Sequence, residues 1–270
     1  MVVVSDLPAR RRYGSAPFRV ALLHGGPGAL GYLAPVARRL GERRGIVEPL
    51  LRAPSVAGQL EELRGTLADV EGPVTVVGHS WGAVLGYLLA ARTPELVDRV
   101  VLVASAPFDE RYATDLLATR LARMDDTEQR AATAALTVVE DRSVDAGTRA
   151  TELARLDELF TKADGYDLVS LDTGVEADLP DVYERVWAEV RPLRASGELV
   201  RLGRRIRCPV VGVHGDHDPH PADGVRVPLA PVLADFRFTV LERCGHLPWL
   251  ERQAREPFYE VLEAALPARR

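Results

Sequence analysis

Short apolar segments alternate with longer amphipathic ones along most of this chain, and this alternation restricts the fold more than any other feature. The apolar segments are too uniformly hydrophobic for strands with one wet face, and they lie at 18–23, 45–50, 74–77, 99–104, 209–214 and 236–241. Helical spacing occupies 31–41, 57–70, 81–92 and 251–265. Strands that alternate with helices predict the α/β class, with a mainly parallel sheet covered on both faces.

The alternation stops after Pro107. Residues 108–201 contain no convincing strand, and helical patterns lie at 111–124, 126–139, 146–162 and 181–195. A chain of 270 residues with 47 % hydrophobic residues can build one sizeable core. We therefore predict one core domain from residues 1–107 and 202–270. Residues 108–201 would form a helical cap of the same domain, inserted before the last two strands.

Charge and hydropathy exclude several classes of partner. The net charge is −5 and the pI is near 5.8, so no basic field for nucleic acid is expected. No apolar run approaches the roughly 20 residues of a membrane span. Residues 2–4 are apolar, but no long apolar region or cleavage pattern follows them, so we expect no signal peptide. Cys208 and Cys244 are expected to be free thiols. We expect a cytoplasmic protein with a small-molecule substrate and no nucleic-acid or membrane partner, and a homodimer is compatible with the sequence.

The segment VTVVGHSWG, residues 74–82, brings strand-forming residues directly to a serine between two glycines. A serine at a sharp turn from a buried strand into a helix stands clear of the sheet, and its hydroxyl is available for chemistry. Gly78 and Gly82 fit such a turn because the strand and helix pass too closely for a Cβ. We interpret Ser80 as a nucleophile, with a buried structural turn as the alternative.

A nucleophilic serine needs a general base and an acid that orients the base. In the nucleophile-elbow layout they follow in the order serine, acid, histidine, each at the carboxyl end of a strand. His246 follows the last apolar segment and Asp218 the one before it. The other histidines fit less well: His24, His79, His214, His217 and His220. Alternatives to the acid are Asp216, Asp223 and Asp109.

The segment HGGPG, residues 24–28, follows the first strong strand and precedes a helix. Its glycines allow backbone N–H groups to face a ligand, so the amides of Gly26 and Trp81 are the expected oxyanion donors. The segment HGDHDPH, residues 214–220, also suggests a metal site with His and carboxylate ligands. No helix fixes the spacing of these residues, and we expect neither a metal nor a cofactor.

Together, HGGPG, GHSWGAVLGYLLAARTPELVDRVVLVASAP, GDHDP and GHLPWLE resemble the landmarks of the α/β-hydrolase superfamily in their usual order. Within it, HGGPG with GxSWG is similar to the proline iminopeptidase group, which removes N-terminal residues from small peptides. The resemblance implies Ser80 as nucleophile, Asp218 as acid and His246 as base. The chain departs from that group where it reads GIVEPLLRAPSVAGQLEEL, because a DQRGxGxS-like segment is missing there.

We therefore expect a serine hydrolase that cleaves a small ester or amide through an acyl-enzyme intermediate. Three alternatives remain: an aminopeptidase, a non-catalytic ligand-binding protein of the same fold, and a metal-dependent hydrolase. Residues 161–190 are a suspected substrate-binding region, because their acidic residues outnumber the basic ones and a carboxylate there would bind a substrate ammonium group. The alternative is a solvated acidic helix face.

Overall fold

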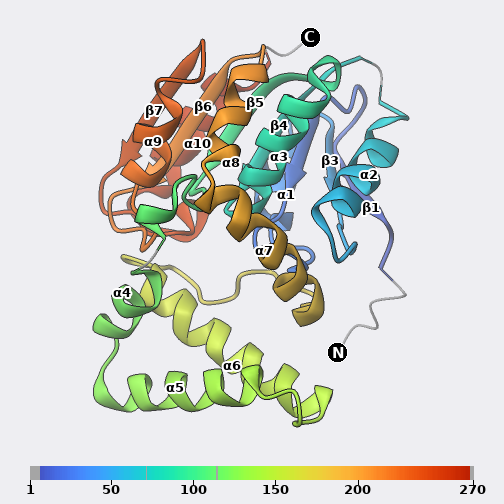
Figure 1. Ribbon diagram of the computed structural model, residues 1–270. Coiled ribbons are helices and arrows are strands. Elements are labelled where there is room, and N and C mark those ends of the chain that lie inside the picture. The colour runs from blue at the N-terminus through green and yellow to red at the C-terminus, as the bar shows by residue number, and fades with distance from the viewer. Residues whose placement is uncertain (1–6, 71, 114, 268–270) are drawn as a thin grey trace.

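The computed structural model describes residues 7–70, 72–113 and 115–267, and a seven-stranded sheet runs through its upper part (Figure 1). Residues 2–4 lie outside the described residues. The strands are β1 (Arg10–Tyr13), β2 (Val20–Leu23), β3 (Ile46–Pro49), β4 (Val74–His79), β5 (Val97–Val103), β6 (Val210–Gly215) and β7 (Phe236–Leu241). Their order across the sheet is β1-β3-β2-β4-β5-β6-β7. Every neighbouring pair is parallel except β1 and β3, so the predicted mainly parallel sheet is confirmed.

Strand β1 is the one strand that the sequence analysis did not predict. Its sequence is RRRY, so it carries no apolar signal. It lies at the sheet edge and pairs only with β3. Charged side chains are typical of edge strands, where they discourage pairing with another chain.

The central strands divide their side chains between two hydrophobic clusters, as the two-residue period of a strand requires. Val76 and Leu102 belong to the cluster on one face, and Val77 and Val103 to the cluster on the other. The first face is covered by α2 (Val56–Leu67), α3 (Trp81–Arg92), α8 (Glu198–Arg201) and α9 (Asp223–Leu229). The second face is covered by α1 (Ala34–Gly41) and α10 (Arg255–Ala265). Helices therefore cover both faces, as predicted.

Between β5 and β6 the described part of the chain is helical, apart from loops and isolated bridges. The main helices are α4 (Leu116–Ala122), α5 (Asp126–Glu140), α6 (Ala146–Asp164) and α7 (Pro180–Ala195). Helix α4 begins five residues later than predicted, because a short 3-10 helix at Glu110–Tyr112 precedes it. A capping box formed by Asp125 and Glu128 starts α5.

The helices of this insertion pack in two different ways. Helices α5 and α6 share a small apolar cluster that includes Ala132, Ala135 and Leu156. Helix α7 instead joins the main core through Val186 and Val190. In Figure 1, α4, α5 and α6 lie below the sheet, and α7 lies between them and the core helices.

None of the helices in the described part of the chain combines the length and the apolar character that a membrane crossing requires.

Candidate active site

Ser80 lies at the turn from β4 into α3, in a backbone conformation that side-chain-bearing residues rarely adopt. Its φ is 52° and its ψ is −113°. Such strained residues concentrate at functional sites. A Cβ at Gly78 would come 2.1 Å from the carbonyl oxygen of Gly82, and one at Gly82 would come 2.2 Å from that of Leu23. Glycine is therefore required at both positions, for the reason inferred from the sequence. Ser80 itself is 9 % exposed.

Asp218 and His246 lie close together, although 28 residues separate them in the sequence. The Nδ1–H of His246 donates a 2.9 Å hydrogen bond to Oδ2 of Asp218. The backbone N–H of His220 donates to Oδ1 of the same carboxylate at 2.9 Å. His214 is also buried against this group, because its Nε2 lies 3.3 Å from Oδ2 of Asp218 and donates to the carbonyl of His220 at 2.8 Å. Asp218 is thus held from three directions.

The charges of this pair shift both pKa values in the directions that base catalysis needs. Burial lowers the pKa of His246, but the negative charge of Asp218 and their hydrogen bond outweigh it, so this pKa lies above its usual value. Burial alone raises the pKa of Asp218, but the neighbouring His246 and His214 hold it far below its usual value. Asp218 therefore remains ionised and stabilises a protonated His246.

His79 connects the elbow to the loop that carries His246. Its Nε2–H donates a 2.8 Å hydrogen bond to the carbonyl of His246, and the two rings are 4.6 Å apart. Burial and the charge of His246 lower the pKa of His79 well below its usual value, so its ring is neutral. Tyr32 stacks on the same ring at 5.2 Å. The sequence analysis set His79 aside as a base, and this contact gives it a role in placing the His246 loop.

No hydrogen bond joins Ser80 to His246 among the described residues. In unliganded enzymes, catalytic hydrogen bonds are often long and form fully only with substrate bound.

The two expected oxyanion donors lie at the start of α3 and in the loop after β2, and that loop passes Ser80, because a Cβ at Gly25 would lie 3.3 Å from Cβ of Ser80. Trp81 is the first residue of α3, and the first amides of a helix have no acceptor within it. The amide of Gly26, whose φ is 42°, donates to no backbone carbonyl in the described ranges. His24 holds this loop, because its Nδ1–H donates to the carbonyl of Gly25 at 2.9 Å and its Nε2 accepts from Leu51 at 3.2 Å.

The alternatives weighed from the sequence lie elsewhere or have other partners. Asp216 accepts a hydrogen bond from the amide of Cys244, and Asp223 pairs with Arg226 at the surface. Asp109 caps the short 3-10 helix that follows β5. None of the three is bonded to His246 within the described structure.

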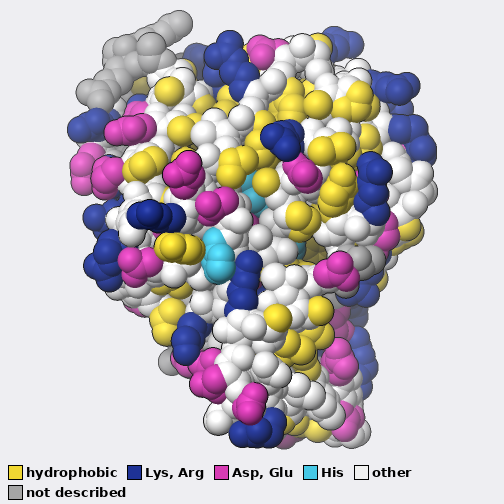
Figure 2. Space-filling view, turned by 90° about the vertical axis from the view of Figure 1, so that its left-hand side faces the viewer, with side chains coloured by type: hydrophobic (Ala, Val, Ile, Leu, Met, Phe, Trp, Pro, Cys, Tyr) yellow, Lys and Arg dark blue, Asp and Glu magenta, His cyan; other side chains and the backbone are white. Residues whose placement is uncertain are grey.

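The three histidines of the suspected metal site face different neighbours. The ring of His217 meets Tyr166 edge-on, and that of His220 lies 5.1 Å from His246. Among residues 7–70, 72–113 and 115–267, no group of three or more His, Cys, Asp or Glu side chains is arranged to hold a metal ion. In Figure 2, histidine side chains reach the surface near the junction between the broad upper part of the molecule and the narrower lower part.

Many acidic residues of the suspected region 161–190 are bound by arginines. The ion pairs are Asp164–Arg120, Asp167–Arg252, Glu176–Arg11 and Glu184–Arg149. The first of them is largely buried, and Arg120 binds both carboxylate oxygens. These acids are therefore not free to meet a ligand.

Asp157 and Asp178 differ from these paired acids. Both are solvent-accessible, yet desolvation by the surrounding protein raises the pKa of Asp157 to about 7 and that of Asp178 to about 6. Both also help to raise the pKa of Tyr32, which stacks on His79 beside Ser80. The negative charge of the insertion therefore affects the pKa of a tyrosine next to the elbow.

Several residues around the site escaped the sequence analysis. Asp157 lies outside the suspected region, and Arg120 is 44 residues from its partner Asp164, so no local pattern indicated either. Gln59 is fully buried and accepts from the indole of Trp81 at 2.8 Å. A polar residue on the apolar face of the predicted helix was its only sequence signal.

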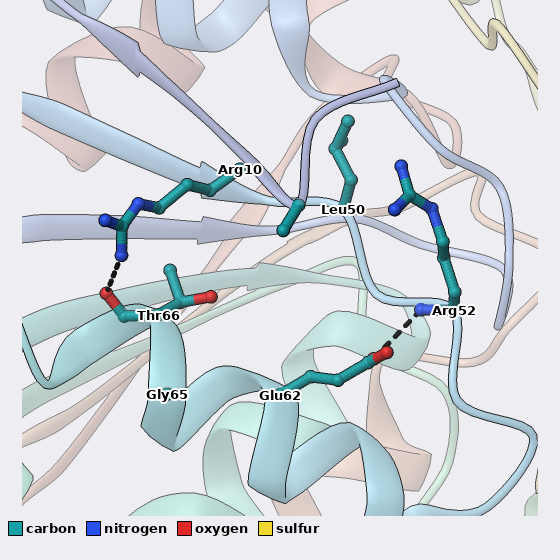
Figure 3. Close-up of a pocket in the computed structure, with 7 residues that line it drawn as sticks. Arg10, Leu50, Arg52, Glu62, Gly65 and Thr66 are labelled. Carbon is teal, nitrogen blue, oxygen red and sulfur yellow. Dashed lines mark hydrogen bonds between the residues drawn. The ribbon is translucent and has the colours of Figure 1, made fainter. Parts of the chain in front are cut away.

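A separate shallow pocket lies between β1 and α2, with a volume of about 220 Å³ (Figure 3). Its lining includes Arg10, Arg52, Glu62 and Thr66. These groups are occupied by the protein itself: Arg10 donates to the carbonyl of Thr66, and Glu62 accepts from the amide of Arg52. The pocket lining has no histidine or cysteine, and it includes none of the residues predicted for the site.

A nucleophile elbow after a central parallel strand, with an acid and a histidine after later strands, defines the α/β-hydrolase class of enzyme. The chain belongs to the alpha/beta hydrolase family, which it matches over residues 13–261. No significant match is found among curated protein sequences.

Solved structures with the same fold cover nearly the whole chain. VinJ matches with a TM-score of 0.65 and 20 % identity, over 95 % of both chains. The enol-lactonase from Burkholderia xenovorans LB400 matches with a TM-score of 0.57 and 20 % identity, over 94 % of this chain and 95 % of that one. A carboxylesterase from the thaumarchaeon Nitrososphaera gargenis matches with a TM-score of 0.59 and 18 % identity, over 94 % and 92 %. These likenesses confirm the predicted α/β-hydrolase fold.

Proposed function

We propose that this protein is a serine hydrolase that cleaves a small-molecule ester through an acyl-enzyme intermediate. The observation that carries the proposal is the buried His246–Asp218 hydrogen bond, 2.9 Å long, on a loop that His79 ties to the strained turn at Ser80. Solved neighbours described as an enol-lactonase and a carboxylesterase support esters and lactones as the substrate class.

In this reaction Nε2 of His246 accepts the Ser80 proton as Oγ attacks the carbonyl carbon. Asp218 keeps the proton of His246 on Nδ1 and stabilises the imidazolium. The amides of Gly26 and Trp81 would bind the oxyanion that develops. His246 then protonates the leaving alcohol, and water releases the acid by the same steps in reverse. No step requires a metal or a cofactor.

We assign the helices between β5 and β6 the role of a cap over the site, continuous with the core formed by residues 1–107 and 202–270. A cap limits bulk water around the reacting groups, while it admits the water that hydrolyses the acyl-enzyme, and it shapes the pocket for the acyl or leaving group. The desolvated carboxylates of Asp157 and Asp178 support this assignment, because they belong to the insertion and influence Tyr32 next to the elbow.

Intact-mass measurement after treatment with a fluorophosphonate tests the nucleophile. We expect one adduct on the wild type, none on Ser80→Ala, and one on Ser105→Ala. Ser105 is the matched control because it is also buried directly beyond a central strand. The adduct should also form in the presence of EDTA. A folded wild-type protein that remains unlabelled, or labelling that EDTA abolishes, would refute the proposal.

The second candidate is an aminopeptidase, and the observation that favours it is the pair Asp157 and Asp178. Burial is the main cause of the raised pKa of Asp157, and repulsion by the charge of Asp178 adds to it. A substrate ammonium group between them would relieve this repulsion.

Alanyl and prolyl anilides, each with a free or an acetylated amine, separate the two candidates. An aminopeptidase should cleave only the free amines and lose this preference in Asp178→Asn, but not in the exposed control Asp172→Asn. Equal cleavage of free and acetylated substrates would refute the aminopeptidase and favour the esterase.

A further inference from the structure

Glu251 is a buried carboxylate that the proposed reaction does not use. Its exposure is 0 %, and it forms no ion pair within the described residues. Three backbone amides donate to it instead. Those of Gly245 and Tyr166 bind Oε1 at 2.7 and 2.8 Å, and that of Asp167 binds Oε2 at 2.8 Å. A buried carboxyl group of this kind is retained only where its hydrogen bonds are made.

These three bonds connect two segments that are far apart in the sequence. Gly245 directly precedes His246, and residues 166–167 follow α6 after one intervening residue, Gly165. The same two segments are joined by the amide of His246, which donates to the carbonyl of Asp164 at 2.9 Å. They approach so closely that a Cβ at Gly245 would lie 2.0 Å from that carbonyl oxygen.

We propose that Glu251 is a positioning residue for His246. It fixes the backbone at Gly245 and joins that loop to the end of α6, so the imidazole is held where it binds Asp218 and can act on Ser80 when substrate is bound. The inference rests on the proposed serine hydrolase reaction. It also assigns the cap a second task, because the segment that ends α6 becomes part of the support of the catalytic base.

A glutamine at this position distinguishes positioning from packing, because it has the size and shape of glutamate. Its amide nitrogen can only donate, so at least one of the three backbone N–H groups loses its acceptor. If His246 moves away from Asp218, it loses the interaction that raises its pKa. The acidic limb of the pH profile should then move to lower pH, which a purely structural defect would not cause.

The experiment compares Glu251→Gln with Glu256→Gln, the same change at an exposed glutamate of α10 that pairs with Arg39. For Glu251→Gln we expect kcat on a p-nitrophenyl ester to fall about 10- to 100-fold with KM nearly unchanged, as is typical when the support of a catalytic group is lost. The acidic limb of kcat/KM should shift to lower pH. Glu256→Gln should match the wild type in all three measurements.

If Glu251→Gln does not fold by circular dichroism, Glu251→Asp replaces it, because that variant keeps the carboxyl group and shortens the side chain. It should show a smaller loss of kcat and a smaller shift of the same limb. A folded Glu251 variant with the kcat and pH profile of Glu256→Gln overturns the inference. Fluorophosphonate labelling of the wild type distinguishes failure of the Glu251 inference from failure of the proposed hydrolase function. If the wild type is labelled, only the role of Glu251 is refuted. If it is not labelled, the serine hydrolase proposal itself is refuted.

Discussion

Gly78 of the elbow and two helix glycines, Gly65 of α2 and Gly86 of α3, allow a graded test of how closely β4 and α3 pack. Three glycines differ in what an added Cβ would meet. At Gly65 it meets nothing within 4 Å, and at Gly86 it comes 2.8 Å from Cγ1 of Val76. At Gly78 it comes 2.1 Å from the carbonyl oxygen of Gly82. Replacing each glycine by alanine therefore makes one chemical change at three levels of crowding.

The expected free energies of unfolding follow from these contacts. Gly65→Ala should stabilise the protein by about 0.5–1 kcal/mol, because alanine is the better residue inside a helix. Gly86→Ala has the same gain, but displacing Val76 costs about 1–3 kcal/mol. In Gly78→Ala the clash is with backbone, and the contact must lengthen from 2.1 to at least 3.0 Å. Helix α3 cannot move that far, because nearly all of its residues are buried, so we expect a loss above about 4 kcal/mol.

Equilibrium urea unfolding followed by circular dichroism measures all three variants against the wild type. The stability should decrease in the order Gly65→Ala, wild type, Gly86→Ala, Gly78→Ala. Labelling of Ser80 by a fluorophosphonate should persist in Gly65→Ala and be lost in Gly78→Ala. If Gly78→Ala unfolds within about 1 kcal/mol of the wild type, the argument that glycine is needed for the elbow is wrong.

Three further predictions concern the charges of the site. Asp218→Asn should lower kcat about 10⁴-fold, whereas Asp216→Asn should have little effect, and steady-state ester hydrolysis distinguishes them. Because His246 acts as a base only when neutral and its pKa is raised, kcat/KM should increase with pH, with a midpoint above pH 6.5. A pH-rate profile with its acidic midpoint below 6.5 contradicts this prediction. Arg120→Met should destabilise the fold by about 3–5 kcal/mol by leaving Asp164 buried without its partner, and the double variant Arg120→Met/Asp164→Leu should recover most of that loss in urea unfolding.

The sheet was predictable from the sequence wherever burial on both faces leaves an apolar run. Strands β2 to β7 coincide with such runs to within a few residues. Strand β1 could not be found this way, because an edge strand of three arginines and a tyrosine is held by backbone pairing with β3 and by little apolar burial. Helix α9 also escaped prediction, since it has seven residues and contains Pro228.

The insertion shows a different limit. Its helices were predicted because their apolar positions repeat with helical spacing, but their packing was not. Nothing in the sequence distinguishes α7, which joins the main core, from α5 and α6, which pack on each other. The partners of Asp164 and Glu184 are likewise set by this packing, so the acidic region 161–190 gave no sign that arginines neutralise much of it.

At the site, the order of residues along the chain was enough to select Ser80, Asp218 and His246 as candidates, because the carboxyl ends of parallel strands lie at one edge of the sheet. Their roles stay predictions until the labelling experiment. The pKa directions were beyond the sequence, since they depend on burial and on His214, whose Nε2 approaches Asp218 from the end of β6.

The position of His246 depends on contacts that no local pattern contains. It lies on a loop, and a loop residue can serve as a base only if its backbone is fixed from outside. Here its N–H is bound by Asp164 of the insertion, its carbonyl by His79 of the elbow, and the preceding N–H by Glu251. His79 is 167 residues away from His246 in the sequence, and Asp164 belongs to the insertion. These contacts therefore form only when the chain folds. The sequence thus predicts which histidine is the base, whereas the precision of its placement comes from three segments folding together.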